Sequence, residues 1–245
     1  MAFDQEATAA LASELDVELR LAHPIRILER SLEIYGDQIA LVSSFGAESA
    51  VLLHMVSQVN PAQPVLFLDT GMLFAQTLDY RRALSSRLGL TGVRDLRPAF
   101  QDLAVRDSES KLWQSDTEAC CEIRKVLPLN RALEGFEAWI TGRKRFHGGE
   151  RLSLPVVEAA EGMVKFNPLA NWDKAALDAY GLQHNLPQHP LVAQGYPSLG
   201  CWPCTQAVSL GEDVRAGRWA GSEKTECGIH VARASVGPSD FGGDI

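Results

Sequence analysis

The chain has 245 residues, 46% of them hydrophobic and 22% charged, and this balance excludes a collagen-like or wholly disordered protein. Lys and Arg number 23 against 31 Asp and Glu, so the formal net charge is −8. Such an acidic chain is unsuited to general binding of nucleic acid or anionic membranes. An anionic ligand would therefore have to be held by a local group of basic residues.

The length fits one large α/β domain, or one domain with a small extension. No run of about 18 apolar residues occurs, so we expect no membrane span. The N-terminus starts acidic and lacks the positive region of a signal peptide, which favours the cytoplasm. We expect an N-terminal helical extension (1–35), a main α/β domain with the binding sites (36–210) and a mobile C-terminal segment (211–245).

The predicted elements alternate along the chain. Residues 1 to about 35 are expected to be helical, with a break at Pro24. Strands are expected at 39–43, 65–68, 93–96, 138–141 and 164–167, and helices at 48–59, 73–88, 117–133 (bent or interrupted at Pro128) and 173–180. Residues 143–155 and 186–204 are expected to be loops. Apolar strands that alternate with helices predict a doubly wound, mainly parallel sheet with helices on both faces.

A loop, SSFGAES, follows the first strand at residues 43–49, where open α/β sheets bind ligands. Gly46 allows the backbone to approach an anion, and Ser44 and Ser49 offer hydroxyl donors beside the N-terminus of the next helix. An ordinary turn with a glycine is the alternative. The loop lacks the lysine of a Walker loop and resembles the SGGxDS loop of the adenine-nucleotide alpha-hydrolase (PP-loop) group, with Ala47 and Glu48 as departures.

The second strand ends in Asp69, Thr70 and Gly71, which can turn tightly and line an adenosine pocket. A turn that merely ends the strand is the alternative. The two loops together favour a nucleotide as the ligand.

Five cysteines occur as an adjacent pair, a CxxC pair and one further residue: Cys120, Cys121, Cys201, Cys204 and Cys227. In a cytosolic protein this pattern favours a four-thiolate metal site and one free thiol, the alternative being five unrelated buried cysteines. Adjacent helical cysteines project about 100° apart, so one centre requires a large cluster or a distorted helix. A 4Fe-4S cluster meets this requirement better than zinc, which is the second choice.

Basic residues gather near these motifs. Lys125 follows Cys121 by four residues and shares its helical face, so it can reach an anion beside the metal site. Lys224 and His230 flank Cys227 and favour its thiolate. Further cations lie after the fourth strand (Arg143, Lys144, Arg145 and Arg151) and before Cys227 (Arg215 and Arg218). Each alone fits a surface charge, but together they indicate an anionic ligand that arginine can bind through two hydrogen bonds.

In combination, CCEIRKVLPL, GCWPC and KTECGIH resemble the assimilatory sulfonucleotide reductases, and most closely the bacterial iron–sulfur adenylyl-sulfate reductases. SFGAES and VLFLDTG support the resemblance, which runs from about residue 39 to His230. It implies reduction of adenosine 5′-phosphosulfate to sulfite and AMP in sulfate assimilation and cysteine biosynthesis, through an S-sulfocysteine on Cys227. With no fused thioredoxin-like domain in the chain, the electrons are expected from a separate thioredoxin or glutaredoxin.

The resemblance also implies roles for single residues. It implies a 4Fe-4S cluster on Cys120, Cys121, Cys201 and Cys204, a nucleotide loop with Ser44, Gly46 and Ser49, and contacts to the phosphosulfate from Lys125, Arg151, Arg215 and Arg218. His230 matches the histidine of the family's ECGxH motif and is expected to bind the substrate. The family often has an Arg-Arg-acid-Gln run where this chain has Lys144-Arg145-Phe146-His147, which leaves the role of this loop open. We expect a homo-oligomer.

Three alternatives remain open at this point. The substrate could carry a 3′-phosphate, alone or in addition, although the four cysteines favour the nucleotide without it. The chain could be a PP-loop ATP pyrophosphatase, such as an enzyme of sulfur transfer to tRNA. It could also be a non-enzymatic, zinc-stabilised nucleotide-binding module.

Overall fold

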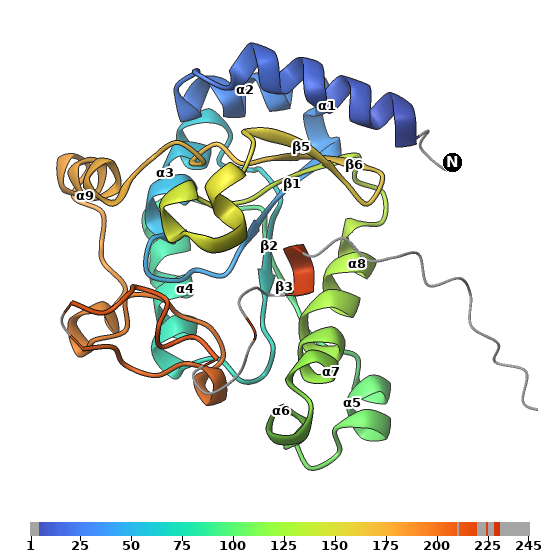
Figure 1. Cartoon of the computed structure of the whole chain (residues 1–245), viewed down its shortest axis with the longest axis vertical. Helices are drawn as coiled ribbons and strands as arrows, with labels where there is room; N and C mark the ends of the chain where they lie inside the picture. Colours follow the sequence, from blue (N-terminus) through green and yellow to red (C-terminus); the bar gives the residue numbers. More distant parts are fainter. Residues whose placement is uncertain (1–4, 210, 220–223, 225–227, 231–245) are drawn as a thin grey trace, which may run out of the picture.

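The computed structural model describes residues 5–209, 211–219, 224 and 228–230, and these form helices around one central sheet (Figure 1). The strands are β1 (Ile39–Ser43), β2 (Val65–Leu68), β3 (Val93–Leu96), β4 (Ala138–Ile140), β5 (Val157–Ala160) and β6 (Met163–Phe166). The α-helices are α1 (Gln5–Leu19), α2 (Pro24–Tyr35), α3 (Ser49–Val59), α4 (Ala75–Arg87), α5 (Phe100–Arg106), α6 (Leu112–Ser115), α7 (Thr117–Cys121), α8 (Leu127–Leu133) and α9 (Lys174–Gln183).

Shorter helical turns connect these elements. The 3-10 turns are η1 (Gly36–Gln38), η3 (Arg145–His147), η4 (Gly149–Ser153), η5 (Val192–Gln194), η6 (Trp202–Cys204) and η7 (Gly228–His230), and η2 (Glu122–Val126) is a π-helical turn. In the described part of the chain, no helix combines the length and the apolar character needed to cross a bilayer.

The strands are ordered β3-β2-β1-β4-β6-β5. Neighbouring strands run parallel except β5, which pairs antiparallel with β6 at one edge. The chain steps outward from β1 to β3 and then crosses to β4 on the other side of β1. This reversal opens a crevice at the carboxyl ends of β1 and β4. The predicted doubly wound, mainly parallel sheet is confirmed.

Both faces of the sheet are covered (Figure 1). Along β1, Ile39 and Leu41 point into the larger apolar core, while Ala40 points into a smaller core on the opposite face. The larger core contains residues of α1, α2, α3, α4 and α9, and the smaller one contains Leu129 and Leu133 of α8. Successive side chains of a strand point to opposite faces, so an apolar strand of this kind needs helices on each side.

The N-terminal helices pack onto the same sheet. Leu15 and Leu19 of α1 are buried in the larger core. The carboxylate of Asp16 accepts hydrogen bonds from the backbone N–H groups of Val156 and Val157, at 2.8 and 3.0 Å. The predicted break at Pro24 is the start of α2. The predicted domain boundaries at residues 35 and 210 stay predictions.

The helical region 117–133 differs from its prediction. Pro128 does not interrupt it, because this proline lies in the first turn of α8, where its missing N–H group costs little. The irregularity is instead the π-helical turn η2, which directly follows Cys121. The sequence also did not predict β5, α5 or α6, because these short elements have no clear apolar period. It likewise did not predict the two 3-10 turns η3 and η4, which lie in the expected loop 143–155.

Candidate active site

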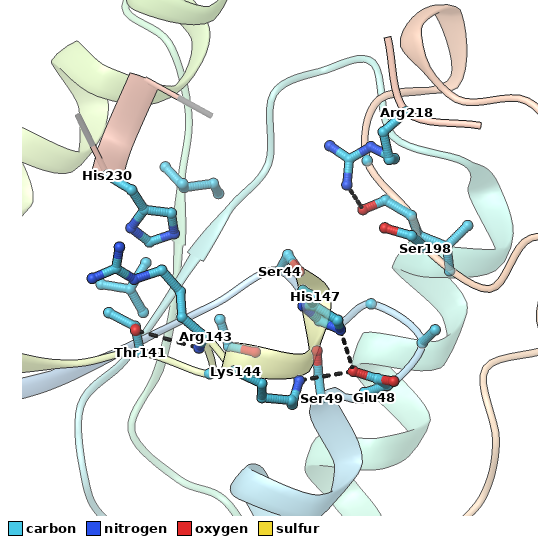
Figure 2. Close-up of a pocket in the computed structure, with 18 of the residues that line it drawn as sticks. Ser44, Glu48, Ser49, Thr141, Arg143, Lys144, His147, Ser198, Arg218 and His230 are labelled. Atoms are coloured by element: carbon cyan, nitrogen blue, oxygen red, sulfur yellow. Dashed lines mark hydrogen bonds and ion pairs between the residues drawn. The ribbon is translucent and has the colours of Figure 1, made fainter. Parts of the chain in front are cut away.

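One cavity opens at the crevice between the ends of β1 and β4 (Figure 2). Its wall includes Ser44, Gly46 and Ser49 from the loop after β1, Thr141 and Arg143 after β4, and Ser198, Arg215, Arg218 and His230 from the C-terminal part of the chain. In Figure 2, His230 and Arg143 lie on one side of the cavity, and Ser198 and Arg218 lie on the other. The cavity therefore joins segments that are far apart in the sequence.

The loop after β1 has an uncommon backbone. Phe45 is fully buried and has a positive φ of 48°, a conformation that bulky residues rarely adopt. Its ring packs edge-on against Phe67 of β2, with 5.4 Å between ring centroids, and this packing holds the strained residue in place. A Cβ atom on Gly46 would lie 3.2 Å from the Ser44 hydroxyl oxygen, so glycine suits this position. The loop consequently presents its backbone and hydroxyl groups to the cavity.

A buried charge network supports this loop. The Glu48 carboxylate, just before α3, accepts hydrogen bonds from Lys144 Nζ at 2.8 Å and His147 Nε2 at 3.1 Å (Figure 2). Burial alone would raise the pKa of Glu48, but the His147 hydrogen bond and the Lys144 charge lower it to about 2. Burial lowers the pKa of Lys144, while Glu48 raises it again. Glu48 is therefore a carboxylate at neutral pH.

One cysteine forms another part of the wall, and the other cysteines that the structure describes lie near it. Cys201 lines the cavity and shares a small buried cluster with Cys120 and Met72. The Thr70 hydroxyl lies 3.2 Å from Cys201 Sγ, and Lys125 Nζ lies 3.6 Å from Cys121 Sγ.

The pKa values of the thiols reflect this burial. Burial first, and then the neighbouring Cys121 and Cys201, raise the pKa of Cys120 to about 12, although Arg124 opposes the effect. Burial also raises the pKa of Cys204, with Cys201 adding to the effect, whereas Lys125 and two other cations oppose it. The two cysteine pairs thus approach each other although about 80 residues separate them.

These thiols are the residues that could hold a metal centre. Iron–sulfur clusters take cysteine thiolates, and zinc takes them as well. Among the described residues, no three Cys, His, Asp or Glu side chains come close enough together to hold a single metal ion. A cluster of several irons accepts ligands that are farther apart, and Met72, Leu112 and Trp113 give Cys120 and Cys201 apolar neighbours, which limit the access of solvent.

Arg124 fixes the helix that carries the cysteine pair. Its guanidinium donates to the Asp107 carboxylate at 2.6 and 3.0 Å and to the Thr70 carbonyl at 2.9 Å. The side chains of this ion pair are 4% and 1% exposed. The adjacent residue, Lys125, is also buried and reaches the cavity. The π-helical turn therefore directs Arg124 to Thr70, in the loop after β2, and Lys125 to the cavity.

The C-terminal residues that the structure describes lie against these elements. Lys224 forms an ion pair with Glu118 of α7. A Cβ atom on Gly228 would lie 3.3 Å from a methyl group of Val126. His230 stacks on Trp139 of β4, with 5.9 Å between centroids and 13° between ring planes. Burial, followed by the charge of Lys165, holds the pKa of His230 well below its usual value, so its ring is neutral at neutral pH.

The predicted nucleophile, Cys227, lies outside the described residues. The structure does describe Lys224 and Gly228, which lie on either side of it in the sequence. Lys224 contacts α7 and Gly228 contacts η2, and this stretch of helix carries the cysteine pair. Arg215 and Arg218 lie over the Trp219 ring, at 5.8 and 4.4 Å from its centroid.

The structure brings most of the predicted substrate residues together. Ser44, Gly46, Ser49, Thr70, Lys125, Arg151, Arg215, Arg218 and His230 all line the cavity. Asp69 and Gly71 are not part of its wall: the Asp69 carboxylate accepts a hydrogen bond from Arg97 at 2.9 Å, and Gly71 faces Arg124. Sequence reasoning missed Glu48 and His147 as site residues. The only signals for them were an acid inside the loop and the basic run after the fourth strand.

Comparison with known proteins identifies the family. The model of the phosphoadenosine phosphosulfate reductase domain matches residues 38–207. A protein of Mesorhizobium japonicum named adenosine 5′-phosphosulfate reductase is 49% identical over 96% of this chain and 93% of its own length. A Gloeobacter violaceus protein named phosphoadenosine 5′-phosphosulfate reductase is 42% identical over 85% of this chain and 88% of its own length.

A solved structure agrees with these matches. The phosphoadenylyl-sulfate reductase of Candida auris, crystallised as a phosphate complex, superposes with a TM-score of 0.68 and 28% identity over 80% of this chain and 96% of that chain. The resemblance that the cysteine motifs indicated is therefore confirmed. Since the family model covers well over half of the sequence, the chain belongs to the phosphoadenosine phosphosulfate reductase family.

Proposed function

We propose that this protein reduces adenosine 5′-phosphosulfate to sulfite and AMP in sulfate assimilation, in the cytoplasm, with electrons from thioredoxin or a related dithiol protein. One observation carries the proposal: a single cavity joins a PP-loop-like turn, a group of buried cations and the thiol of Cys201. Similar proteins named adenosine 5′-phosphosulfate reductase, such as that of Mesorhizobium japonicum, support the choice of substrate.

The cavity has the charge that an anionic nucleotide requires. The chain as a whole is acidic, yet Lys125, Arg151, Arg215 and Arg218 all line this one cavity. We assign the phosphosulfate to these residues and the adenosine side of the substrate to the loop after β1. The neutral His230 has a buried Nδ1 atom without a hydrogen-bond partner among the described residues, so it can serve the same ligand.

The first chemical step would be a nucleophilic attack by the Cys227 thiolate on the sulfur of the substrate. A bond forms between the two sulfur atoms, and the bond between that sulfur and the phosphate oxygen breaks. The electron pair of the broken bond leaves with AMP, and the lysine and arginine side chains stabilise the charge that develops on its phosphate. The product on the protein is an S-sulfocysteine.

The second step would return the thiolate. A thiolate of the donor attacks Cys227 Sγ, and the electron pair of the sulfur–sulfur bond leaves with sulfite. The second donor thiol then attacks the mixed disulfide and releases the Cys227 thiolate. The sulfuryl group gains two electrons in this way, and the donor dithiol becomes a disulfide.

We further propose that Cys120, Cys121, Cys201 and Cys204 hold a 4Fe-4S cluster. Cys120 and Cys201 share an apolar cluster, and Cys121 and Cys204 lie close enough to one or the other of them to influence its charge, which fits such a group. The π-helical turn after Cys121 is the helix distortion that two adjacent ligands require. When bound, the cluster would supply a fixed charge and a rigid support beside Lys125 and would not supply the electrons of the reaction. Lys125 itself, buried 3.6 Å from Cys121 Sγ, would orient toward the substrate anion.

The decisive experiment is a mass measurement of the intact protein after incubation with adenosine 5′-phosphosulfate in the absence of a thiol donor. We expect a gain of one SO3 group that maps to Cys227, and release of sulfite when thioredoxin is added. The Cys227→Ser variant should show no gain. If the gain is absent, or if the variant releases sulfite at the normal rate, the proposal is wrong.

A second assay addresses the substrate and the metal. The Gloeobacter relative is named for the 3′-phosphorylated substrate, so sulfite release should be compared with both nucleotides. We expect the nucleotide without the 3′-phosphate to be preferred.

Anaerobically purified protein should be brown and contain iron, whereas a colourless protein with zinc would favour the alternative of a zinc-stabilised nucleotide-binding module.

A further inference from the structure

A chain of hydrogen bonds links Arg151 in the cavity wall to the loop after β1. Arg151 Nη1 lies 3.1 Å from His147 Nδ1, and His147 Nε2 lies 3.1 Å from a Glu48 carboxylate oxygen, which also accepts from Lys144. Gly148 lies between the turn that ends at His147 and the turn Gly149–Ser153 that carries Arg151, and both glycines have positive φ values, of 71° and 60°. This backbone turn, which favours glycine, brings Arg151 back beside the ring.

The partners fix the tautomer of His147. A guanidinium has only donors, so Nδ1 of the ring must accept from Arg151. A carboxylate has only acceptors, so Nε2 must carry the proton and donate to Glu48. The neutral ring satisfies both neighbours at once. A protonated ring would instead present an N–H group to the N–H group of Arg151.

We propose that His147 is a positioning residue, which holds the Arg151 guanidinium toward the anionic part of the substrate by accepting its hydrogen bond. This inference rests on the proposed function, because it needs adenosine 5′-phosphosulfate as the ligand. His147 itself acts through Arg151 and contributes by geometry. His147 is itself hydrogen-bonded to Glu48, which lies directly before α3. The same network therefore connects Arg151 to the loop after β1, to which we assign the adenosine side of the nucleotide.

The charged groups around His147 determine how its hydrogen bond to Arg151 responds to pH. Glu48 faces the ring from the loop before α3, Lys144 from its own segment and Arg151 from η4. Burial lowers the pKa of His147, and the two cations lower it too, whereas Glu48 raises it, and the result lies below 6.5. The ring is therefore neutral at neutral pH and accepts from Arg151. As the pH falls through this lowered pKa, the acceptor is lost and substrate binding weakens.

The test measures the dissociation constant of adenosine 5′-phosphosulfate by calorimetry in the Cys227→Ser background, in which no reaction should follow binding. At neutral pH, His147→Leu should weaken binding roughly 10- to 100-fold, because a charged hydrogen bond loses its acceptor. His147→Gln should bind within about threefold of the parent, since its amide offers both an acceptor and a donor. His184→Gln, on an exposed histidine outside the cavity, is the matched control and should not change binding.

The pH profile separates positioning from simple packing. The parent should lose affinity below pH 6.5, and His147→Gln should bind equally well across that range. Three results would overturn the inference: His147→Leu binds like the parent, His147→Gln keeps the acid loss, or affinity rises as the pH falls, which would make the ring a cation for the substrate. If the parent protein does not bind this nucleotide at all, the proposed function fails and this inference fails with it.

Discussion

Two walls of the cavity balance their charges in different ways. In the loop wall, made of Glu48, Lys144, His147 and Arg151, the Glu48 carboxylate meets a lysine and a histidine. What we call the cysteine wall is Cys201, which lines the cavity, together with Cys120, Cys121 and Cys204, which do not line it. Burial opposes the ionisation of Cys120, whose pKa is raised to about 12, and raises the pKa of Cys204 as well.

This difference shows which part of the site the protein completes by itself. The ion pairs of the loop wall form when the chain folds. The cysteine wall suits a group that replaces thiol protons, because metal binding requires thiolates and releases those protons. Damage to the loop wall should therefore change nucleotide affinity, and damage to the cysteine wall should change the metal content. The following predictions test that separation.

The largest effect is expected from Cys201→Ala. Removal of one thiolate from a four-ligand cluster should abolish stable iron binding, so the purified variant should be colourless and inactive. Iron analysis and the absorption spectrum measure this outcome. Cys227→Ala is the matched control and should keep its iron while losing the sulfonated adduct. A Cys201→Ala protein that retains the parent's iron content would contradict the assignment of this wall.

The next largest effect is expected from Asp107→Asn. This change leaves the buried guanidinium of Arg124 without its counter-charge, and the free energy of unfolding should fall by about 3–5 kcal/mol. Urea unfolding measures the loss. The control is Asp102→Asn, which breaks the ion pair between Asp102 and Arg131. This pair is more exposed than the Asp107–Arg124 pair, so the free energy of unfolding should fall by less than about 1 kcal/mol. Equal losses in the two variants would show that the buried pair does not hold the cysteine helix in place.

Glu48→Gln should have an intermediate effect, confined to the loop wall. The folded pKa of Glu48, about 2, lies below its usual value of 4.5, so its stabilising contribution is present above pH 4.5 and is lost as the pH falls toward 2. The variant should lose roughly 1–3 kcal/mol at neutral pH and part of the acid dependence of stability. Its iron content should equal that of the parent. Loss of iron in this variant would mean that the two walls are coupled.

The smallest effect is expected from Asp69→Asn. Asp69 lies outside the cavity wall and pairs with Arg97, whose side chain is 72% exposed, so stability should change by less than about 1 kcal/mol. The dissociation constant of adenosine 5′-phosphosulfate should stay within about twofold of the parent value. A tenfold weaker affinity would instead support the role in substrate binding that the sequence predicts for Asp69.

Local patterns in the sequence were sufficient for every described strand except β5, and for the cysteine motifs. The apolar runs at 39–43 and 65–68 coincide closely with β1 and β2, because a strand buried on both faces must be apolar throughout. The motifs CCEIRKVLPL, GCWPC and KTECGIH resembled those of the family without any knowledge of distances. By contrast, β5 has no such run, and only its pairing with β6 makes it a strand.

Partnerships between distant residues were decided by the tertiary structure alone. Glu48 and Lys144 are 96 positions apart, and no local rule connects an acid in one loop with a lysine in another. The π-helical turn at 122–126 likewise accompanies contacts that Arg124 makes with Asp107 and Thr70. Sequence determines which residues are apolar, basic or able to bind metal, since these are properties of single side chains. Which of them meet depends on how the strands are ordered and how the helices pack, and that is settled only when the whole chain folds.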